Sequence, residues 1–289
     1  MEARQRLDGE VAAAVAAIRD AATKADHVGP MSEQALLRVR FDAPETEHLL
    51  GLDDGVLAGY AQLDHAGSSA EVVVHPDHRR RGIGRALVTE LLSVARGREV
   101  RVWAHGDLPA AAALAAATGF AKVRSLWLMR RPIDADLPEL RIPYGITVHT
   151  FRPGVDDEAW VAVNARAFAD HPEQGRLTVA DLHQRTQQPW FDPAGFFVAW
   201  RAATMAGFHW TKVHDATTGE VYVLGIDPTE RGNRLGKALL LVGLHHLQRR
   251  GLAEAILYVE ETNTAGIGLY TELGFTRVAV DVMYANSPE

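Results

Sequence analysis

The chain contains the same sequence pattern twice, about half its length apart. The first copy reads VVVHPDHRRRGIGRALVTELL from Val72 to Leu92, and the second reads VLGIDPTERGNRLGKALLLVGL from Val223 to Leu244. Each copy is an apolar strand, a turn that contains a proline, and an Arg/Gly-rich loop that leads into an amphipathic helix. Further on, Gly119-Phe120 matches Gly274-Phe275 at nearly the same separation. One unit has therefore been duplicated, and the chain is expected to fold as two similar units.

The repeated loop has the composition of a phosphate-binding turn. A helix N-terminus leaves backbone N–H groups unpaired and carries partial positive charge, and glycines let a phosphate approach those groups closely. In the first copy Arg79, Gly82 and Gly84 have the spacing R-x-x-G-x-G. This differs from the G-x-G-x-x-G and P-loop patterns, which argues against dinucleotide-binding and P-loop proteins. We predict one anion-binding loop in each copy.

The second loop departs from the first at one position. It reads Arg231-Gly232-Asn233-Arg234-Leu235-Gly236, with Arg234 where the first copy has Gly82. An arginine in the left-handed conformation would be strained by roughly 1–2 kcal/mol. We therefore expect the second loop to adopt a conformation that Arg234 tolerates, with its guanidinium available to a phosphate.

The two copies together resemble the GNAT (GCN5-related N-acetyltransferase) family, in which R/Q-x-x-G-x-G/A holds the pyrophosphate of acetyl-CoA. The second copy also contains NTAGIGLYTELGF, from Asn263 to Phe275, after the apolar strand Ala255–Val259. The strings FHWTKV, EVYVLGIDP and LYVEETN are similar to a tandem subfamily that acetylates the cysteinyl amine of Cys-GlcN-Ins. The resemblance implies a mixed α/β fold: two tandem GNAT domains, each a mostly antiparallel sheet with flanking helices.

The resemblance also implies which residues contact acetyl-CoA or CoA. In the first copy these are Val72, Val73, Val74, Arg79, Arg80, Gly82, Ile83, Gly84 and Arg85. In the second copy they are Leu224, Gly225, Ile226, Arg231, Gly232, Asn233, Arg234, Leu235, Gly236, Lys237, Asn263, Thr264, Ala265, Gly266, Ile267 and Gly268. The residues implied for the acceptor are Glu33, Glu173, Lys212, Glu220 and Tyr258. Carboxylates suit a cationic, polyhydroxylated acceptor because they accept hydrogen bonds from ammonium and hydroxyl groups.

The two copies differ where the chemistry would take place. Tyr270 of the second copy corresponds to Ala115 of the first, and Glu220 corresponds to Ser68. An N-acetyltransferase needs a base for the substrate ammonium and an acid for the leaving thiolate, and a carboxylate and a phenol suit these tasks. We therefore expect the second unit to catalyse and the first to bind CoA without catalysing. The alternative interpretations are a solvated charge at the strand start for Glu220 and a core aromatic for Tyr270.

Strand alternation makes a further prediction about the catalytic carboxylate. A period of two would place Glu220, Tyr222, Leu224 and Ile226 on one face of their strand. The backbone of Leu224 to Ile226 is then expected to contact the acetyl group, as the resemblance implies.

Composition excludes several classes of protein. A length of 289 residues favours two domains, and the net charge of −7 argues against a nucleic-acid partner. No apolar run reaches the ~20 residues of a membrane span, and we expect no signal peptide. The chain has no cysteine, which excludes disulfides, thiolate metal sites and an acyl-cysteine intermediate. The 13 histidines show no metal-site spacing, so we expect no metal site. We also expect the protein to be a cytoplasmic monomer.

The expected domains are residues 1–131, a Pro-rich and charged linker at 132–145, and residues 146–289. The predicted elements are helices at 8–25, 110–117, 157–168 and 179–187 and strands at 46–52, 56–63, 69–74, 100–104, 125–130, 195–201, 204–213 and 277–284. Two other functions stay open. One is a tandem GNAT enzyme for another small amine or a protein N-terminus, and the other is an acyl-CoA sensor without turnover.

Overall fold

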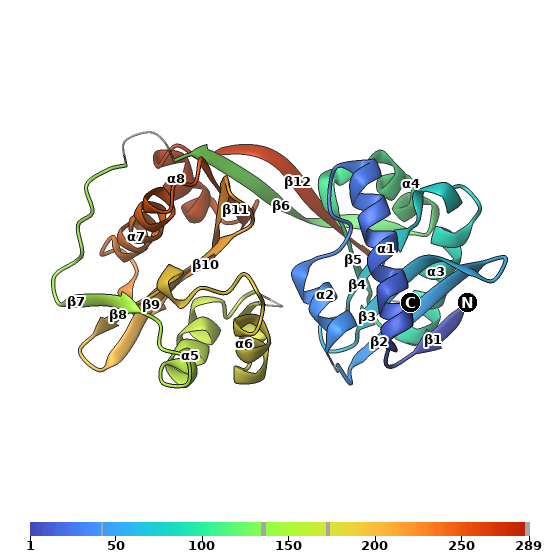
Figure 1. Cartoon of the computed structure of the whole chain (residues 1–289), viewed down its shortest axis with the longest axis horizontal. Coiled ribbons are helices and arrows are strands. Elements are labelled where there is room, and N and C mark those ends of the chain that lie inside the picture. Colours follow the sequence, from blue (N-terminus) through green and yellow to red (C-terminus); the bar gives the residue numbers. More distant parts are fainter. Residues whose placement is uncertain (42, 134–136, 172–173, 287–289) are drawn as a thin grey trace. The chain divides into compact units, whose positions relative to one another are not determined.

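The structure is a computed structural model that describes residues 1–41, 43–133, 137–171 and 174–286. The chain forms two compact units. Unit 1 comprises Met1–Leu126 together with the chain from Ala279 onward, and unit 2 is Trp127–Val278. Each unit is described by itself, with the labels of Figure 1.

Unit 1 is a sheet with two helices packed on each face (Figure 1). Its strands follow the order β1-β2-β3-β4-β5-β12. Their bounds are β1 Glu2–Arg4, β2 Thr46–Asp53, β3 Val56–Asp64, β4 Ser69–Val74, β5 Arg101–Ala104 and β12 Thr276–Asn286. The helices are α1 Gly9–Asp26, α2 Glu33–Arg40, α3 Ile83–Ala95 and α4 Pro109–Ala117.

The two faces of this sheet are covered by different helices. Residues of α1 and α2 pack with Leu50, Tyr60 and Val73 in one buried cluster. Residues of α3 and α4 pack with Leu49 and Ala61 in another cluster, because alternate side chains of a strand point to opposite faces. The amphipathic helix predicted after the first loop is confirmed, since Ile83, Leu87, Val88 and Leu91 of α3 are buried.

Unit 2 repeats this arrangement. Its strands follow the order β6-β11-β10-β9-β8-β7. Their bounds are β6 Phe120–Pro132, β7 Ile146–Thr150, β8 Phe196–Arg201, β9 Thr204–Val213, β10 Thr218–Ile226 and β11 Glu254–Glu260. The helices are α5 Asp157–Ala167, α6 Val179–Thr186, α7 Leu235–Arg249 and α8 Thr264–Glu272. Residues of α5 pack on one face of the sheet, and residues of α7 and α8 pack on the other.

The last strand alters the expected domain boundaries. β12 begins in unit 2, but its residues from Ala279 belong to unit 1, where Val282 pairs with Ala104 of β5. β6 likewise begins in unit 1 and ends in unit 2. The two units are therefore not the consecutive segments 1–131 and 146–289, because each of these long strands belongs to both.

The fold class is confirmed, with mainly antiparallel pairing and one central parallel pair in each unit among the described residues. β4 runs parallel to β5, and the pairing ends at Glu71 opposite Trp103. β10 runs parallel to β11, and that pairing ends at Val221 opposite Leu257. Beyond these points the first strand of each pair continues without its parallel partner, toward the loop that was predicted to bind an anion.

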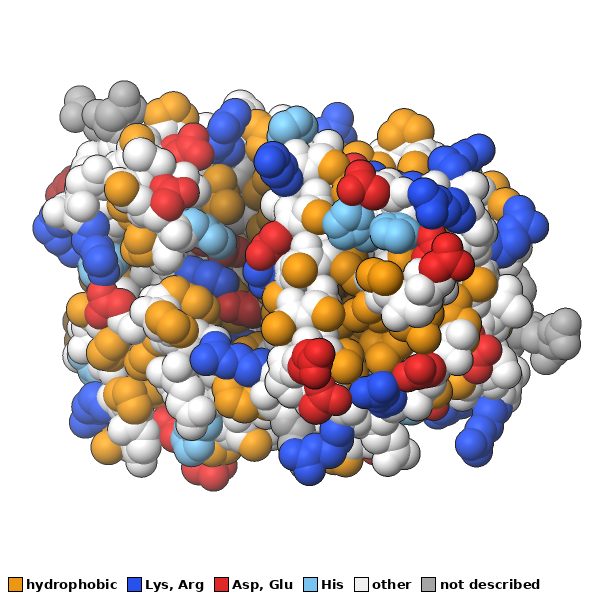
Figure 2. Space-filling view, turned by 45° about the vertical axis from the view of Figure 1, so that its right-hand side comes forward, with side chains coloured by type: hydrophobic (Ala, Val, Ile, Leu, Met, Phe, Trp, Pro, Cys, Tyr) orange, Lys and Arg blue, Asp and Glu red, His pale blue; other side chains and the backbone are white. Residues whose placement is uncertain are grey.

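Two surface properties bear on the classes excluded above. None of the helices in the described part of the chain combines the length and hydropathy of a membrane span. On the face shown in Figure 2, acidic and basic side chains of the described residues are interspersed, without a broad area of one sign.

Candidate active site

The two Arg/Gly loops have nearly the same backbone conformation. His75 and Asp227 precede the turn with φ/ψ of −53°/132° and −52°/132°, and each side chain accepts a hydrogen bond from the backbone N–H two residues later. Arg79 and Arg231 follow the turn with φ/ψ of −67°/160° and −68°/153°. The duplication seen in the sequence therefore extends to local geometry.

Each loop then contains two residues in the left-handed conformation, one arginine and one glycine. The arginine comes first in unit 1, and the glycine comes first in unit 2. In unit 1 they are Arg80, with φ of 64°, and Gly82, with φ of 87°. In unit 2 they are Gly232, with φ of 83°, and Arg234, with φ of 65°. The expectation that Arg234 avoids this conformation is wrong, because the shared turn requires a positive φ at the residue before the helix.

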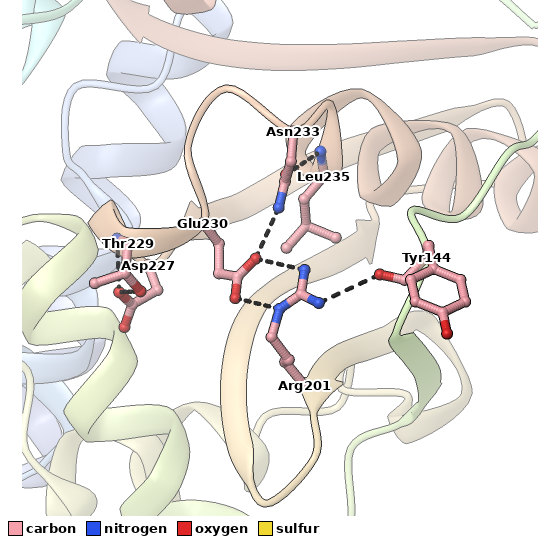
Figure 3. A network of polar contacts seen from close by, with 7 residues as sticks. All are labelled: Tyr144, Arg201, Asp227, Thr229, Glu230, Asn233 and Leu235. Atoms are coloured by element: carbon pink, nitrogen blue, oxygen red, sulfur yellow. Dashed lines mark hydrogen bonds and ion pairs between the residues drawn. The ribbon is translucent and has the colours of Figure 1, made fainter.

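Neighbouring polar groups hold the second loop in this conformation (Figure 3). Arg201 donates from Nε and Nη2 to the two carboxylate oxygens of Glu230, at 2.6 and 2.9 Å, which lowers the pKa of Glu230. Asn233 donates to Glu230 at 2.7 Å, and its Oδ1 accepts from the N–H of Leu235 at 3.0 Å. A strained residue persists where surrounding contacts fix its conformation, and this network fixes the residues on both sides of Arg234.

The first arginine of the motif has different partners in the two loops. Arg79 forms a two-pronged ion pair with Asp26 at 2.7 Å for both bonds, and it also donates to the carbonyl of Val74. Arg231 makes only a long contact of 3.4 Å with the carbonyl of Ala167 among the described residues. The guanidinium of Arg231 is therefore the more available of the two to an anion.

Unit 1 contains a cavity of about 770 Å³ at the point where β4 and β5 part. All nine coenzyme residues expected in the first copy line it: Val72, Val73, Val74, Arg79, Arg80, Gly82, Ile83, Gly84 and Arg85. Ala115 also lines the cavity, at the position where unit 2 has Tyr270. No side chain caps the N-terminus of α3 at Gly82, so its backbone N–H groups can receive an anion.

Glu220 lies inside unit 2 with only 7% of its surface exposed. It lies on β10 opposite Lys212 of β9, and its Oε2 is 2.7 Å from Nε2 of His214. The interpretation of Glu220 as a solvated surface charge is therefore wrong. His214 was missed by the sequence reasoning, although its position near the hairpin turn between β9 and β10 places it close to the start of β10.

A β-bulge changes the predicted alternation of β10. The pairing with β9 shifts between Val221 and Val223. Tyr222 and Val223 both pack with the α5 side, whereas Leu224 and Ile226 pack with Leu235 and Leu239 of α7. Glu220 therefore does not share a face with Leu224 and Ile226, because the extra residue of the bulge reverses the phase of the strand.

Tyr270 is buried on α8, with 9% of its surface exposed. It belongs to the cluster that contains Val221 and Leu257, and Leu224 packs against this cluster. Burial raises the pKa of Tyr270 to about 12, and its hydroxyl has no hydrogen-bond partner among the described residues. The predicted coenzyme segment Asn263–Gly268 forms the start of the same helix, where Asn263 accepts a hydrogen bond from the N–H of Gly266.

The expected acceptor residues lie in different elements. Lys212 lies over the ring of Trp190, at 4.4 Å from its centroid, and 5.2 Å from that of Tyr222. Tyr258 is 45% exposed on β11. Glu33 is the first residue of α2 in unit 1, directly after the N-cap Ser32. Glu173 lies outside the described residues.

Two further side chains near Lys212 were not predicted. Arg185 donates from Nε to the hydroxyl of Tyr222 at 3.2 Å, and Trp190 packs against Tyr222 and Trp210. Lone aromatic residues in a polar segment, as in Gln187-Gln188-Pro189-Trp190, give no periodic signal, so the sequence offered little to find them.

Comparison with known proteins agrees with the fold and the duplicated loop. The profile of the Acetyltransferase (GNAT) family matches residues 13–120 and 163–275. Mycothiol acetyltransferase of Thermomonospora curvata is 58% identical over 95% of this chain and 93% of its own length. The mycothiol acetyltransferase of Thermobispora bispora is 55% identical over 94% of each chain.

Solved structures share the fold along the whole chain. A GCN5-related N-acetyltransferase from Sphaerobacter thermophilus has a TM-score of 0.69 and 25% identity, covering 99% of this chain and 95% of its own. A tandem GNAT protein from the clavulanic acid biosynthesis pathway has a TM-score of 0.72 at 20% identity, covering 100% and 99%. The chain therefore belongs to the GNAT acetyltransferase family, and within it to the tandem-domain mycothiol acetyltransferases.

Proposed function

We propose that this protein transfers the acetyl group of acetyl-CoA to the cysteinyl amine of Cys-GlcN-Ins, which gives mycothiol and CoA. The observation that carries the proposal is the identity of 58% to a mycothiol acetyltransferase along nearly the whole of both chains. The buried Glu220 and Tyr270 of unit 2 support it, because they supply a base and an acid.

Acetyl-CoA supplies an activated acetyl group as a thioester, and the chain is suited to hold it in two places. In unit 2 the loop Arg231–Lys237 and the start of α8 are the proposed phosphate and pantetheine contacts. The parting of β10 from β11 after Val221 supports this assignment, because the strand backbone beyond that point is not paired with β11. The guanidinium of Arg231, whose contact with the carbonyl of Ala167 is long at 3.4 Å, favours an anion at the same loop.

Glu220 is proposed to take the proton that the substrate ammonium must lose before the amine can attack. Backbone N–H groups near Leu224–Ile226 are proposed to stabilise the negative charge that develops on the carbonyl oxygen. The amine then displaces CoA directly, since the chain has no cysteine that could carry the acetyl group. The carbon–sulfur bond breaks, and the thiolate of CoA leaves.

Tyr270 is proposed to give its proton to this thiolate. The raised pKa of about 12 means that the phenol is protonated at neutral pH, so its proton is present when the thiolate forms. Unit 1 has Ala115 and Ser68 at the two equivalent positions. We infer that unit 1 binds CoA or acetyl-CoA in its cavity but does not catalyse.

Steady-state kinetics with acetyl-CoA and Cys-GlcN-Ins test the proposal. Glu220→Gln and Tyr270→Phe should each lower kcat by about 10²- to 10⁴-fold. The matched controls are Glu139→Gln, which changes an exposed carboxylate, and Tyr144→Phe, which changes a fully exposed phenol. Both controls should leave kcat unchanged.

The same assay separates the other two functions. Turnover with aminoglycosides, polyamines or a peptide N-terminus but not with Cys-GlcN-Ins would identify a different acceptor. Binding of acetyl-CoA without turnover of any amine would identify a sensor. Near wild-type kcat in Glu220→Gln would remove the proposed base.

A further inference from the structure

Unit 1 contains a histidine–carboxylate pair at its cavity that the proposed chemistry does not use. His105 is the first residue after β5, and it lines the cavity. Its Nδ1 is 2.8 Å from Oδ2 of Asp281, and the other carboxylate oxygen accepts the N–H of Gly106 at 2.8 Å. Asp281 lies on β12, next to Val282, which pairs with Ala104. The last strand of the chain therefore fixes the ring of His105 in the unit 1 cavity.

The second nitrogen of this imidazole has no partner. Nε2 of His105 is buried and makes no hydrogen bond with any described residue. Both side chains of the pair are largely buried, with 13% of His105 and 10% of Asp281 exposed. A buried polar atom without a partner is unfavourable, and such atoms usually bond to a ligand, an ion or water. The ring lines the cavity, so a ligand that fills the cavity lies against it.

The surrounding charges favour the protonated ring. Burial alone would lower the pKa of His105, but the hydrogen bond to Asp281 and the charge of Glu71 outweigh it and raise the pKa. Glu71 is on β4 and is itself held by the N–H of Ser32 at 2.9 Å. Arg124 lies over the ring of Trp103, at 5.2 Å from its centroid. In the protonated ring Nδ1–H donates to Asp281, and Nε2–H is the donor that remains.

We propose that His105 binds the pantetheine–thioester arm of CoA in unit 1, by donating from Nε2 to a carbonyl oxygen of that arm. The phosphates would occupy the loop from Arg79 to Arg85, and His105 lies in the same cavity at the end of β5. The residue of unit 2 at the offset that relates Ala115 to Tyr270 is Glu260, which cannot donate when ionised, so the contact is particular to unit 1. The proposal rests on the proposed binding of CoA by unit 1.

Calorimetric titration of the whole chain at neutral pH tests this contact, with three probes. They are CoA, acetyl-CoA, and 3′-phosphoadenosine 5′-diphosphate, which has the phosphates but no pantetheine. In the double variant His105→Leu/Asp281→Asn, affinity for CoA and acetyl-CoA at one of two sites should fall about 10- to 100-fold. The affinity for 3′-phosphoadenosine 5′-diphosphate should not change. The single variant Asp281→Asn should show a smaller loss with the same selectivity.

The control is His65→Leu, since His65 also pairs with a carboxylate in unit 1, Glu47 at 3.1 Å, but does not line the cavity. It should bind all three probes as the wild type does. A loss confined to acetyl-CoA would identify the thioester carbonyl as the acceptor, and an equal loss for CoA would identify an amide carbonyl. Equal losses for all three probes, or no loss, would overturn the proposal. If the wild type bound CoA at one site only and still turned over, binding by unit 1 would be refuted. Turnover shows separately that unit 2 is intact.

Discussion

Gly82 and Arg234 occupy the same backbone position in the two loops, with φ/ψ of 87°/−6° and 65°/14°. Each is the residue before the helix. The other left-handed residue of each loop is Arg80 in unit 1 and Gly232 in unit 2, so arginine and glycine are exchanged there as well. Each loop therefore contains one glycine and one strained arginine, so the two copies carry similar conformational strain in exchanged places.

This exchange predicts a non-additive pair of substitutions in unit 1. Gly82→Arg alone places two arginines in the left-handed conformation and should lower the unfolding free energy by about 1–2 kcal/mol. Adding Arg80→Gly should restore most of that loss, because the loop then has the glycine and arginine order of unit 2. Urea denaturation of the two single variants and the double variant measures the coupling. A double variant no more stable than Gly82→Arg would show that the loop of unit 1 does not accept the glycine and arginine order of unit 2.

The loops also predict a division of labour between the units. Arg231→Ala with Arg234→Ala should raise the KM for acetyl-CoA by about 10-fold or more, since charge-assisted bonds to phosphate are lost, while the KM for the amine changes little. Gly82→Val should weaken binding in unit 1 because a β-branched residue is strained at this positive φ. It should nevertheless leave kcat and both KM values unchanged. Loss of turnover in a folded Gly82→Val protein would contradict a non-catalytic unit 1.

Much of this architecture could be read from the sequence, because the loops and their flanking strands are local patterns. Ser69–Val74 and Thr204–Val213 have the predicted bounds. The membership of β12 in unit 1 could not be predicted, because an apolar strand does not specify which of two equivalent sheet edges it joins. The bulge at Tyr222 was missed for a similar reason. Alternation is read from residue order, and an inserted residue is visible only from the pairing with β9.

The contact between His214 and Glu220 predicts a positioning role. His214 approaches the carboxylate at 2.7 Å while remaining more exposed than Glu220, at 37% against 9% of the side chain. His214→Ala should lower kcat by about 10-fold, less than Glu220→Gln, because the base remains but is held less firmly. The KM for acetyl-CoA should not change, which distinguishes this effect from general loss of structure. A His214→Ala enzyme with unchanged kcat and an altered acetyl-CoA KM would contradict the role.

His209 predicts how the stability of the protein depends on pH. Its side chain is fully buried and donates to the carbonyl of Leu239 at 2.7 Å, and burial lowers its pKa from 6.5 to about 4. The unfolded chain therefore binds a proton below pH 6.5, whereas the folded chain does so only near pH 4. Stability should fall as the pH is lowered through this window, by about 3 kcal/mol from this residue.

Urea denaturation at several pH values between 7 and 4 measures this contribution. The variant His209→Gln keeps a donor for Leu239 but has no titrating group, so its unfolding free energy should decline less steeply with falling pH. Burial also lowers the pKa of His48 in unit 1 to about 4. His48 should therefore still contribute to the decline of the unfolding free energy with falling pH in this variant. The control His149→Gln removes an exposed histidine of unit 2 and should keep the wild-type slope. Parallel pH profiles for the wild type and His209→Gln would show that His209 does not resist protonation in the folded state.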